Sequence, residues 1–303
     1  MIDRDLIFAM RAAFDRGENM MACARERLGA QVNEKDATLL AYDLLAGGYV
    51  RRVGRDPEGN QKWCSQIAGI LDPYVRAGDV LLEAGCGEAT TLGGVVQALS
   101  EKPSQLLGFD ISWSRCSVAT RWLLGLNVAA RLFLADLFAV PLADASVDVV
   151  FSSHALEPNG GREAAAIAEL LRIARRTVVL VEPIYELASA EAQDRMRQHG
   201  YVRGLRAVAE SLGAEILDHR LLPYSPNPLN PSGVLILRKP AGETHGPNRS
   251  TGPQWQCPHT HGELRDLGDA FFSAASGLAY PVLRGIPLLR VEHAVMASHL
   301  CGS

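Results

Sequence analysis

The sequence predicts an α/β fold with a doubly wound parallel sheet, an N-terminal helical cap and a small C-terminal β domain. Three observations support this prediction. Residues 78–92 have the pattern of a buried strand, a glycine turn and the start of a helix. Strand and helix patterns then alternate, as they do when crossover helices join parallel strands. Two alternating strands, near 215–220 and 234–239, close this region, and the composition changes after residue 240.

Length and composition are typical of a soluble globular protein. The 303 residues suffice for one full α/β domain with small additions, and 48% are apolar and 21% charged. The net charge of −4 argues against a large nucleic-acid-binding surface. No apolar run reaches the roughly 20 residues that span a bilayer. The start of the chain lacks a signal-peptide pattern and the six cysteines lack a framework spacing. We therefore expect reduced thiols and a cytoplasmic location, without membrane association.

Residues 1–70 are predicted to form the helical cap. The stretches with helical patterns are 1–30, 37–45 and 63–71. The polar stretch 51–60 predicts a loop between the second and third of these helices. Such a segment is expected to cover the ligand cleft, where Tyr49, Gln61 and Trp63 would either reach the site or serve packing.

The glycine turn predicts a binding loop for a nucleotide-sized ligand. Gly85 and Gly87 carry no Cβ, so the backbone can turn sharply and approach a ligand closely. The helix that follows directs its free N–H groups toward that ligand. The third glycine of a dinucleotide fingerprint would stand at position 90, which is Thr90. The carboxylate of Glu83 would attract a cationic ligand and repel a pyrophosphate.

The segment from Glu83 to Ala89 resembles the first motif of the class I S-adenosylmethionine (SAM)-dependent methyltransferases, acid-x-Gly-x-Gly-x-Gly. Ala89 replaces the last glycine with another small residue. The resemblance implies that S-adenosyl-L-methionine is the cofactor. It also implies that Glu83, Gly85, Cys86 and Gly87 bind it. Cys86 is interpreted as a small residue that fills space in the loop.

Two later stretches resemble the second and third motifs of this family. Phe109-Asp110-Ile111-Ser112 follows the second predicted strand, where a carboxylate can accept hydrogen bonds from both ribose hydroxyls. An alternative role for Asp110 is the N-cap of the next helix. Ala135-Asp136-Leu137 follows the third predicted strand, and in the family this motif contacts the adenine amine. The resemblance therefore adds Asp110, Ile111, Asp136 and Leu137 to the cofactor-binding residues.

The end of the fourth predicted strand is expected to carry the chemistry. Residues 141–153 resemble the family's fourth motif and place Ser153 beside the cofactor. His154 follows on the face where ligands bind in open α/β sheets. The pKa of an unperturbed histidine, near ~6.5, suits a general base at neutral pH. Glu157 would orient His154 or bind a cationic acceptor. Alternatively, His154 is a loop histidine bonded to backbone, and Glu157 is a solvated carboxylate.

Three further residues are predicted to bind the substrate. Glu182 and Tyr185 follow the fifth predicted strand and would face the same space as His154. Asn159 lies in the turn after Glu157, before Gly160 and Gly161. For Glu182, a capping or solvated role is the alternative. The pair His154 and Glu157 has no third ligand in view, so we predict no metal site.

The last part of the chain differs in character. Residues 241–255 read as a linker, and residues 256–303 follow it. The stretch from Tyr280 to Leu289 has the pattern Tyr-Pro-hydrophobic-x-x-Gly-Ile-Pro-x-Leu and resembles the small Trm112-like zinc-ribbon family. Several members of that family hold zinc with two Cys-x-x-Cys pairs. Here the corresponding residues are Cys257, Thr260, Ser273 and Ser276, and a single thiolate cannot complete a structural zinc site. We therefore predict an emptied ribbon that serves packing or dimerisation.

The resemblance covers about residues 71–240, where four motifs occur in order. It implies a SAM-dependent methyltransferase, and we expect its acceptor to be a small polar molecule such as a sugar or nucleotide-sugar. The methylated atom would be an oxygen or a nitrogen. The alternatives are a methyltransferase whose protein or RNA substrate is recruited by the tail, and a non-catalytic SAM-binding scaffold. The failed fingerprint at Thr90 disfavours an NAD oxidoreductase.

Overall fold

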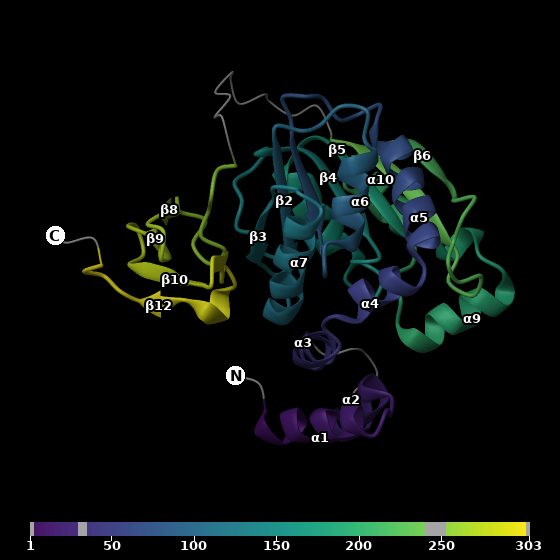
Figure 1. Cartoon of the computed structure of the whole chain (residues 1–303), viewed down its shortest axis with the longest axis horizontal. Coiled ribbons are helices and arrows are strands. Elements are labelled where there is room, and N and C mark those ends of the chain that lie inside the picture. Colours follow the sequence, from purple (N-terminus) through teal and green to yellow (C-terminus); the bar gives the residue numbers. More distant parts are fainter. Residues whose placement is uncertain (1–2, 30–34, 240–252, 301–303) are drawn as a thin grey trace.

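The computed structural model describes residues 3–29, 35–239 and 253–300. A seven-stranded sheet with the order β3-β2-β1-β4-β5-β7-β6 forms its centre (Figure 1). The strands of this sheet are β1 (Val80–Ala84), β2 (Gln105–Asp110), β3 (Arg131–Leu134), β4 (Val147–Ser153), β5 (Ala174–Pro183), β6 (Glu215–Leu221) and β7 (Ser232–Arg238).

The strand directions confirm the predicted doubly wound sheet. Strands β1 to β5 pair in parallel, and β7 runs antiparallel to both β5 and β6. The chain moves outward from β1 to β3 and then returns to the other side of β1 with β4. The carboxyl end of β1 is therefore a switch point, which is where open α/β sheets bind ligands.

Helices cover both faces of the sheet because its strands are apolar on both sides. In β1, Leu81 packs into one buried cluster with Ile67 and Leu92, while Leu82 packs into the opposite cluster with Leu170. This alternation is the two-residue period of a strand buried on both faces. The covering helices are α5 (Pro57–Leu71), α6 (Thr90–Ala98), α7 (Trp113–Gly125), α8 (Glu163–Ile173) and α10 (Leu205–Ser211). Helix α9 (Ala190–His199) and the 3-10 turn η1 (Tyr185–Leu187) connect β5 to α10.

The N-terminal segment is helical, but its boundaries differ from the predicted ones. The elements are α1 (Arg4–Asp15), α2 (Met20–Leu28), α3 (Lys35–Leu44) and α4 (Gly48–Arg55). The prediction of one helix over 1–30 is wrong, because Asn19 caps a new helix by accepting a hydrogen bond from Ala22 N at 3.0 Å. The prediction of a loop over 51–60 is also wrong. Asp56 accepts a hydrogen bond from Gly59 N at 2.9 Å and starts α5, so α4 and α5 fill this stretch.

The C-terminal residues form a second, smaller antiparallel sheet, which fits the predicted ribbon-like domain. Its elements are β8 (Arg265–Asp266), β9 (Ala270–Ser273), β10 (Leu278–Leu283), β11 (Ile286–Pro287), the 3-10 turn η2 (Val291–His293) and β12 (Val295–Met296). Cys257 is buried, and its Sγ lies 3.2 Å from the hydroxyl of Tyr280. In the described residues, no group of three or more His, Cys, Asp or Glu side chains is arranged to hold a metal ion.

This C-terminal sheet packs against the edge strand β3. Leu288 forms a parallel bridge with Leu134, and Leu289 N donates to Leu134 O at 3.0 Å. The predicted linker 241–255 lies outside the described residues except for 253–255. Its last residue, Trp255, packs edge-on between Phe133 and Phe271, with ring centroids 5.0 and 5.2 Å away. The free edge of β3 is thereby covered.

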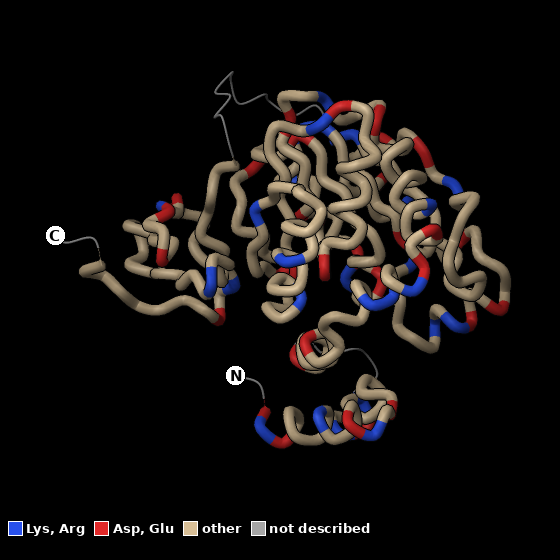
Figure 2. Tube along the Cα trace, viewed as in Figure 1, with Lys and Arg blue, Asp and Glu red and all other residues tan. Residues whose placement is uncertain are grey.

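Basic and acidic residues are interspersed along the described chain (Figure 2). Among the described residues, no helix is both long enough and apolar enough to span a membrane.

We predict that Trp255→Ala lowers the free energy of unfolding by about 3–5 kcal/mol, because it empties the contact between the two sheets. Trp255 is only 9% exposed. Urea unfolding of the full chain measures the change. Leu124→Ala is the control, since Leu124 is 79% exposed and should change stability by less than about 0.5 kcal/mol. Equal stabilities of the two variants would show that Trp255 does not join the sheets.

Candidate active site

A cavity of about 730 Å³ opens at the carboxyl ends of the parallel strands. The glycine loop, the ends of β2, β3 and β4, the N-terminal helices and the loop between β6 and β7 line it. All nine residues predicted to bind the cofactor lie in its wall: Glu83, Gly85, Cys86, Gly87, Asp110, Ile111, Asp136, Leu137 and Ser153. The predicted residues His154, Glu157 and Asn159 line the same cavity.

The glycine loop needs both of its glycines. Gly85 and Gly87 have φ angles of 67° and 54°, in the left-handed region that side chains disfavour. A Cβ on Gly85 would lie 2.4 Å from the Cβ of Ala155. The loop after β1 is therefore in contact with the turn after β4, which carries His154.

Asp110 joins the glycine loop to the loop after β2. Its Oδ2 accepts a hydrogen bond from Gly87 N at 3.0 Å, and its Oδ1 accepts one from Ser112 N at 2.9 Å. Burial raises the pKa of Asp110, although the nearby Arg115 and the backbone N–H groups oppose this rise. The N-cap of α7 is Ser112, whose Oγ accepts from Arg115 N at 3.2 Å, so Asp110 does not have the alternative capping role.

Glu83 is a buried carboxylate with unused bonding capacity. It is 1% exposed, and its Oε2 has no hydrogen-bond partner among the described residues. Burial raises its pKa well above the ordinary value. A cation in the cavity would favour the charged form of this group, because opposite charges attract strongly in a water-poor site.

The N-terminal cap is attached to this end of the cavity by polar contacts. Glu88 of the glycine loop accepts hydrogen bonds from Gly47 N at 2.9 Å and Val50 N at 2.8 Å, at the start of α4. Asp43 of α3 accepts from the hydroxyls of Ser112 and Ser114 at 2.7 and 2.9 Å. Hydrogen bonds therefore join the cap helices α3 and α4 to the loops that follow β1 and β2.

Cap residues also line the cavity. Of the three residues for which reaching the site or packing was left open, Tyr49 and Trp63 line the cavity and Gln61 does not. The guanidinium of Arg115 lies over the rings of Tyr42 and Tyr49, 4.4 and 5.0 Å from their centroids. Sequence reasoning missed Tyr42, Glu88 and Arg115, since no local motif marks them.

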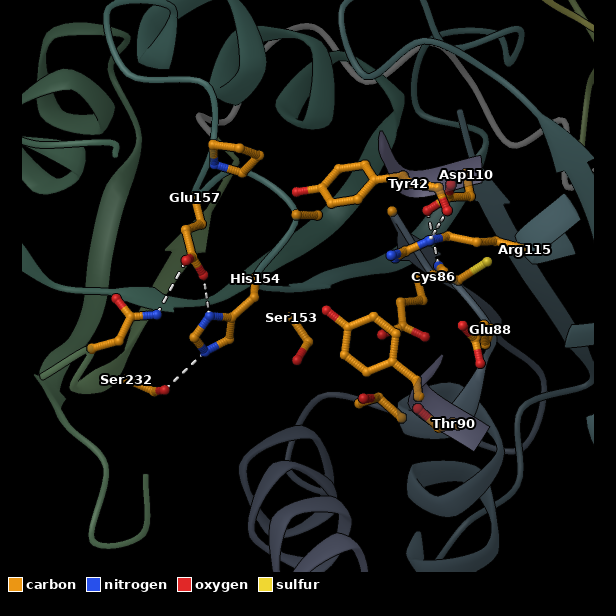
Figure 3. Close-up of a pocket in the computed structure, with 18 of the residues that line it drawn as sticks. Tyr42, Cys86, Glu88, Thr90, Asp110, Arg115, Ser153, His154, Glu157 and Ser232 are labelled. Carbon is orange, nitrogen blue, oxygen red and sulfur yellow. Dashed lines mark hydrogen bonds and ion pairs between the residues drawn. The ribbon is translucent and has the colours of Figure 1, made fainter. Parts of the chain in front are cut away.

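His154 is held by hydrogen bonds at both ring nitrogens (Figure 3). Nδ1 bonds to Glu157 Oε2, and Nε2 lies 2.8 Å from the hydroxyl of Ser232. Glu157 also accepts a hydrogen bond from Asn230 Nδ2 at 3.1 Å. Burial lowers the pKa of His154, but the hydrogen bond and charge of Glu157 outweigh this effect and leave the pKa above its ordinary value. Because both ring nitrogens bond to side chains, His154 is not a loop histidine bonded only to backbone.

Glu182 does not face the substrate space, which corrects the prediction. It is fully buried and does not line the cavity. Its carboxylate accepts hydrogen bonds from Ser152 Oγ at 2.8 Å and from three consecutive N–H groups, those of Ala155, Leu156 and Glu157, at 3.0–3.1 Å. Glu182 thus holds the turn in which His154 adopts a φ of 57°.

Tyr185 is also placed away from the cavity. It lies in η1, and its hydroxyl bonds to Arg197. Asn159 does line the cavity, but its amide donates to Ala155 O at 3.1 Å and Leu156 O at 3.3 Å. Asn159 therefore closes the turn that follows His154.

Several residues that line the cavity on the side of His154 could not be predicted together, because they come from separate elements. They are Arg52, Arg162, Arg195, Tyr201, Tyr224, Ser225, Asn227, Asn230 and Ser232. Only the loop containing Asn227 and Asn230 carries a sequence signal, since its prolines and asparagines mark a long turn.

Comparison with known proteins agrees with this architecture. Residues 81–177 match the family model described as a methyltransferase domain. A 37.1 kDa protein in transposon Tn4556 of Streptomyces fradiae is 29% identical over 130 residues, which are 42% of this chain and 37% of that protein. The chain thus spans little more than a third of this curated relative.

Two solved structures are similar to this chain. The complex of the Haloferax volcanii Trm112 methyltransferase activator with a methyltransferase matches with a TM-score of 0.50 and 16% identity, covering 66% of this chain and 97% of that chain. Magnesium protoporphyrin IX methyltransferase from Synechocystis matches with a TM-score of 0.49 and 16% identity, covering 78% and 100%. Residues 81–177 therefore form a methyltransferase domain, and S-adenosyl-L-methionine is the cofactor of that domain.

Glu182→Gln should lower the free energy of unfolding by about 2–3 kcal/mol, because an amide nitrogen cannot accept the N–H bonds that the second carboxylate oxygen accepts. Denaturant unfolding measures this change. Glu163→Gln is the matched control: Glu163 accepts one bond from Arg203 N, at an exposed position. If Glu182→Gln is no more destabilising than the control, the turn does not depend on Glu182.

Proposed function

We propose that this chain, which contains a SAM-dependent methyltransferase domain, transfers a methyl group to an oxygen or nitrogen of a small polar molecule. A sugar or nucleotide-sugar is one class that fits. The observation that supports this most is that one cavity joins Asp110 and Glu83 to the hydrogen-bonded pair His154 and Glu157. The residues suited to the cofactor and the residues suited to accepting a proton thus line the same cavity.

The residues present suit the cofactor. The orphaned oxygen of Glu83 is suited to the cationic sulfonium or ammonium, and Asp110 has lone pairs that can accept ribose hydroxyls. Ile111, Asp136 and Leu137 line the same end and would contact the adenine. The bound cofactor supplies an activated methyl group with a good leaving group.

The chain's own residues would align the acceptor and take its proton. Glu157 holds the proton of His154 on Nδ1, which leaves the lone pair of Nε2 for a donor. In the structure this donor is the hydroxyl of Ser232, which also lies 3.3 Å from Ser225 Oγ. Ser232 can pass its own proton to Nε2 and take the acceptor's proton in its place, so that His154 receives the proton through this hydroxyl.

The C-terminal sheet is proposed to be Trm112-like and to serve the same chain on which it is packed. The bridge between Leu288 and Leu134 and the packing of Trp255 support this role. Ser273 and Ser276 stand where the zinc-ribbon family has its second cysteine pair. Ser273 is fully buried and its hydroxyl has no partner among the described residues, which fits a ribbon that has lost its metal. Dimerisation through this sheet stays a prediction.

His154→Ala should reduce kcat at least about 100-fold and leave the affinity for S-adenosylhomocysteine unchanged, because the cofactor end stays intact. Turnover is followed as release of S-adenosylhomocysteine with an acceptor found by screening. His219→Ala is the control, since His219 lies on β6 outside the cavity wall. Unchanged turnover in His154→Ala would remove the residue from the mechanism, and no turnover with any acceptor would favour the scaffold alternative.

The rate should also rise with pH. A base acts in its neutral form, so kcat increases as pH rises through the pKa of His154, which, despite burial, the hydrogen bond and charge of Glu157 raise above its ordinary value. Glu157→Gln removes the charge that raises this pKa, so the rising limb should move to lower pH. If the rising limb of the pH–rate profile stays at the same pH in Glu157→Gln, a group other than His154 controls it.

A further inference from the structure

We propose that the acceptor is an anion, bearing a carboxylate or a phosphate, and that Arg162 and Arg195 bind its charge. This inference rests on the proposed function, because it places the acceptor beside His154. The part of the cavity lined by residues 157–162, by Arg195, Gly200 and Tyr201, and by residues 224–227, Asn230 and Ser232 is termed the acceptor end.

Charge is unevenly distributed along the cavity. The carboxylates Glu83, Glu88, Asp110 and Asp136 line the cofactor end, with one cation, Arg115, among them. The acceptor end is lined by Arg162 and Arg195, and Arg52 of the cap helix α4 lines the same cavity. A cationic cofactor suits the first set of charges, and an anionic acceptor suits the second.

The carboxylates near the acceptor end are already engaged. Glu157 bonds to His154 and to Asn230. Asp56 accepts the hydrogen bond of Gly59 N that starts α5. Neither acid forms an ion pair with Arg162 or Arg195 within the described chain, and the hydroxyl of Tyr201, which bonds to both Glu157 and Arg195, separates these two side chains.

The two arginines contact rings and carbonyls rather than acids. Arg162 lies over the ring of Phe138, 3.3 Å from its centroid. Arg195 lies over the ring of Tyr201 at 5.6 Å, and its Nη1 is 3.5 Å from Leu229 O. By contrast, Arg197 on the same helix as Arg195 forms an ion pair with Asp194. Arg162 and Arg195 thus line the cavity and form no ion pair with a carboxylate in the described structure.

The backbone keeps these arginines close to the catalytic pair. Gly160 N donates to Gly200 O at 3.1 Å, and Val202 N donates to Glu157 O at 3.1 Å. A Cβ on Gly160 would lie 2.5 Å from Gly200 O, so only glycine permits this approach. The segment that carries Arg162 and the segment that follows Arg195 are therefore joined beside Glu157.

Two guanidinium groups in one cavity wall can bind carboxylate or phosphate oxygens with charge-assisted hydrogen bonds. The chain as a whole is negative, with a net charge of −4, so an anion needs local cations to enter. Arg162 is exposed and Arg195 is half-buried, and solvent limits what each contributes. Loss of either is expected to weaken anion binding about tenfold.

The test is calorimetric titration of the S-adenosylhomocysteine-saturated full chain with malonate and, separately, with inorganic phosphate. We expect binding by the wild-type chain, about tenfold weaker binding by Arg162→Gln and by Arg195→Gln, and none by the double variant. Arg197→Gln is the matched control and should bind as the wild type does. Preference for malonate indicates a carboxylate acceptor, and preference for phosphate indicates a phosphorylated one.

Equal anion binding by the double variant, or no binding by the wild type, would overturn the proposal. The titration needs no turnover, so its result is separate from that of the proposed methyl transfer. Binding of S-adenosylhomocysteine by every variant checks that the cofactor end is intact. Thermal unfolding of each variant excludes loss of the fold as the cause.

Discussion

The site depends on the buried carboxylate of Glu182. With no cation bonded to it in the described structure, this group accepts three consecutive N–H bonds of the turn after β4 and the hydroxyl of Ser152. Removing such a group would leave buried donors without partners, which is more costly than the bonds are individually worth. The same turn places His154 at a left-handed φ and presses Ala155 against Gly85. One side chain thereby sets both the catalytic turn and its contact with the cofactor loop.

The cap is attached to the sheet domain by hydrogen bonds that two carboxylates accept. Glu88 and Asp43 bind backbone and hydroxyl donors on opposite sides of the same interface. These contacts tie α3 and α4 to the loops that follow β1 and β2. The cap is therefore positioned by residues next to the cofactor motifs. The rings of Tyr42 and Tyr49 on the cap also contact the guanidinium of Arg115.

The sheet and the cofactor end could be predicted because their signals are local. A strand followed by Gly85 and Gly87, and a later strand ending in Asp110, define positions that the parallel sheet brings together. Glu182 and Tyr185 were misplaced because sequence shows where a strand ends but not which way its last side chains point. The start of α5 was missed because Asp56 and Pro57, which also suit a turn, here begin a helix. The acceptor wall joins α9, the β6–β7 loop and the cap, and no local pattern predicts that meeting.

The proposed chemistry requires that the cavity bind S-adenosyl-L-methionine through the ends of β1 and β2. The most direct measurement is calorimetric titration of the wild-type chain and of Asp110→Ala with S-adenosylhomocysteine, with NAD as the control ligand. We expect a dissociation constant in roughly the micromolar range for the wild type, a loss of binding in Asp110→Ala and no binding of NAD. Absence of S-adenosylhomocysteine binding by the wild type, or equal binding by Asp110→Ala, would contradict it.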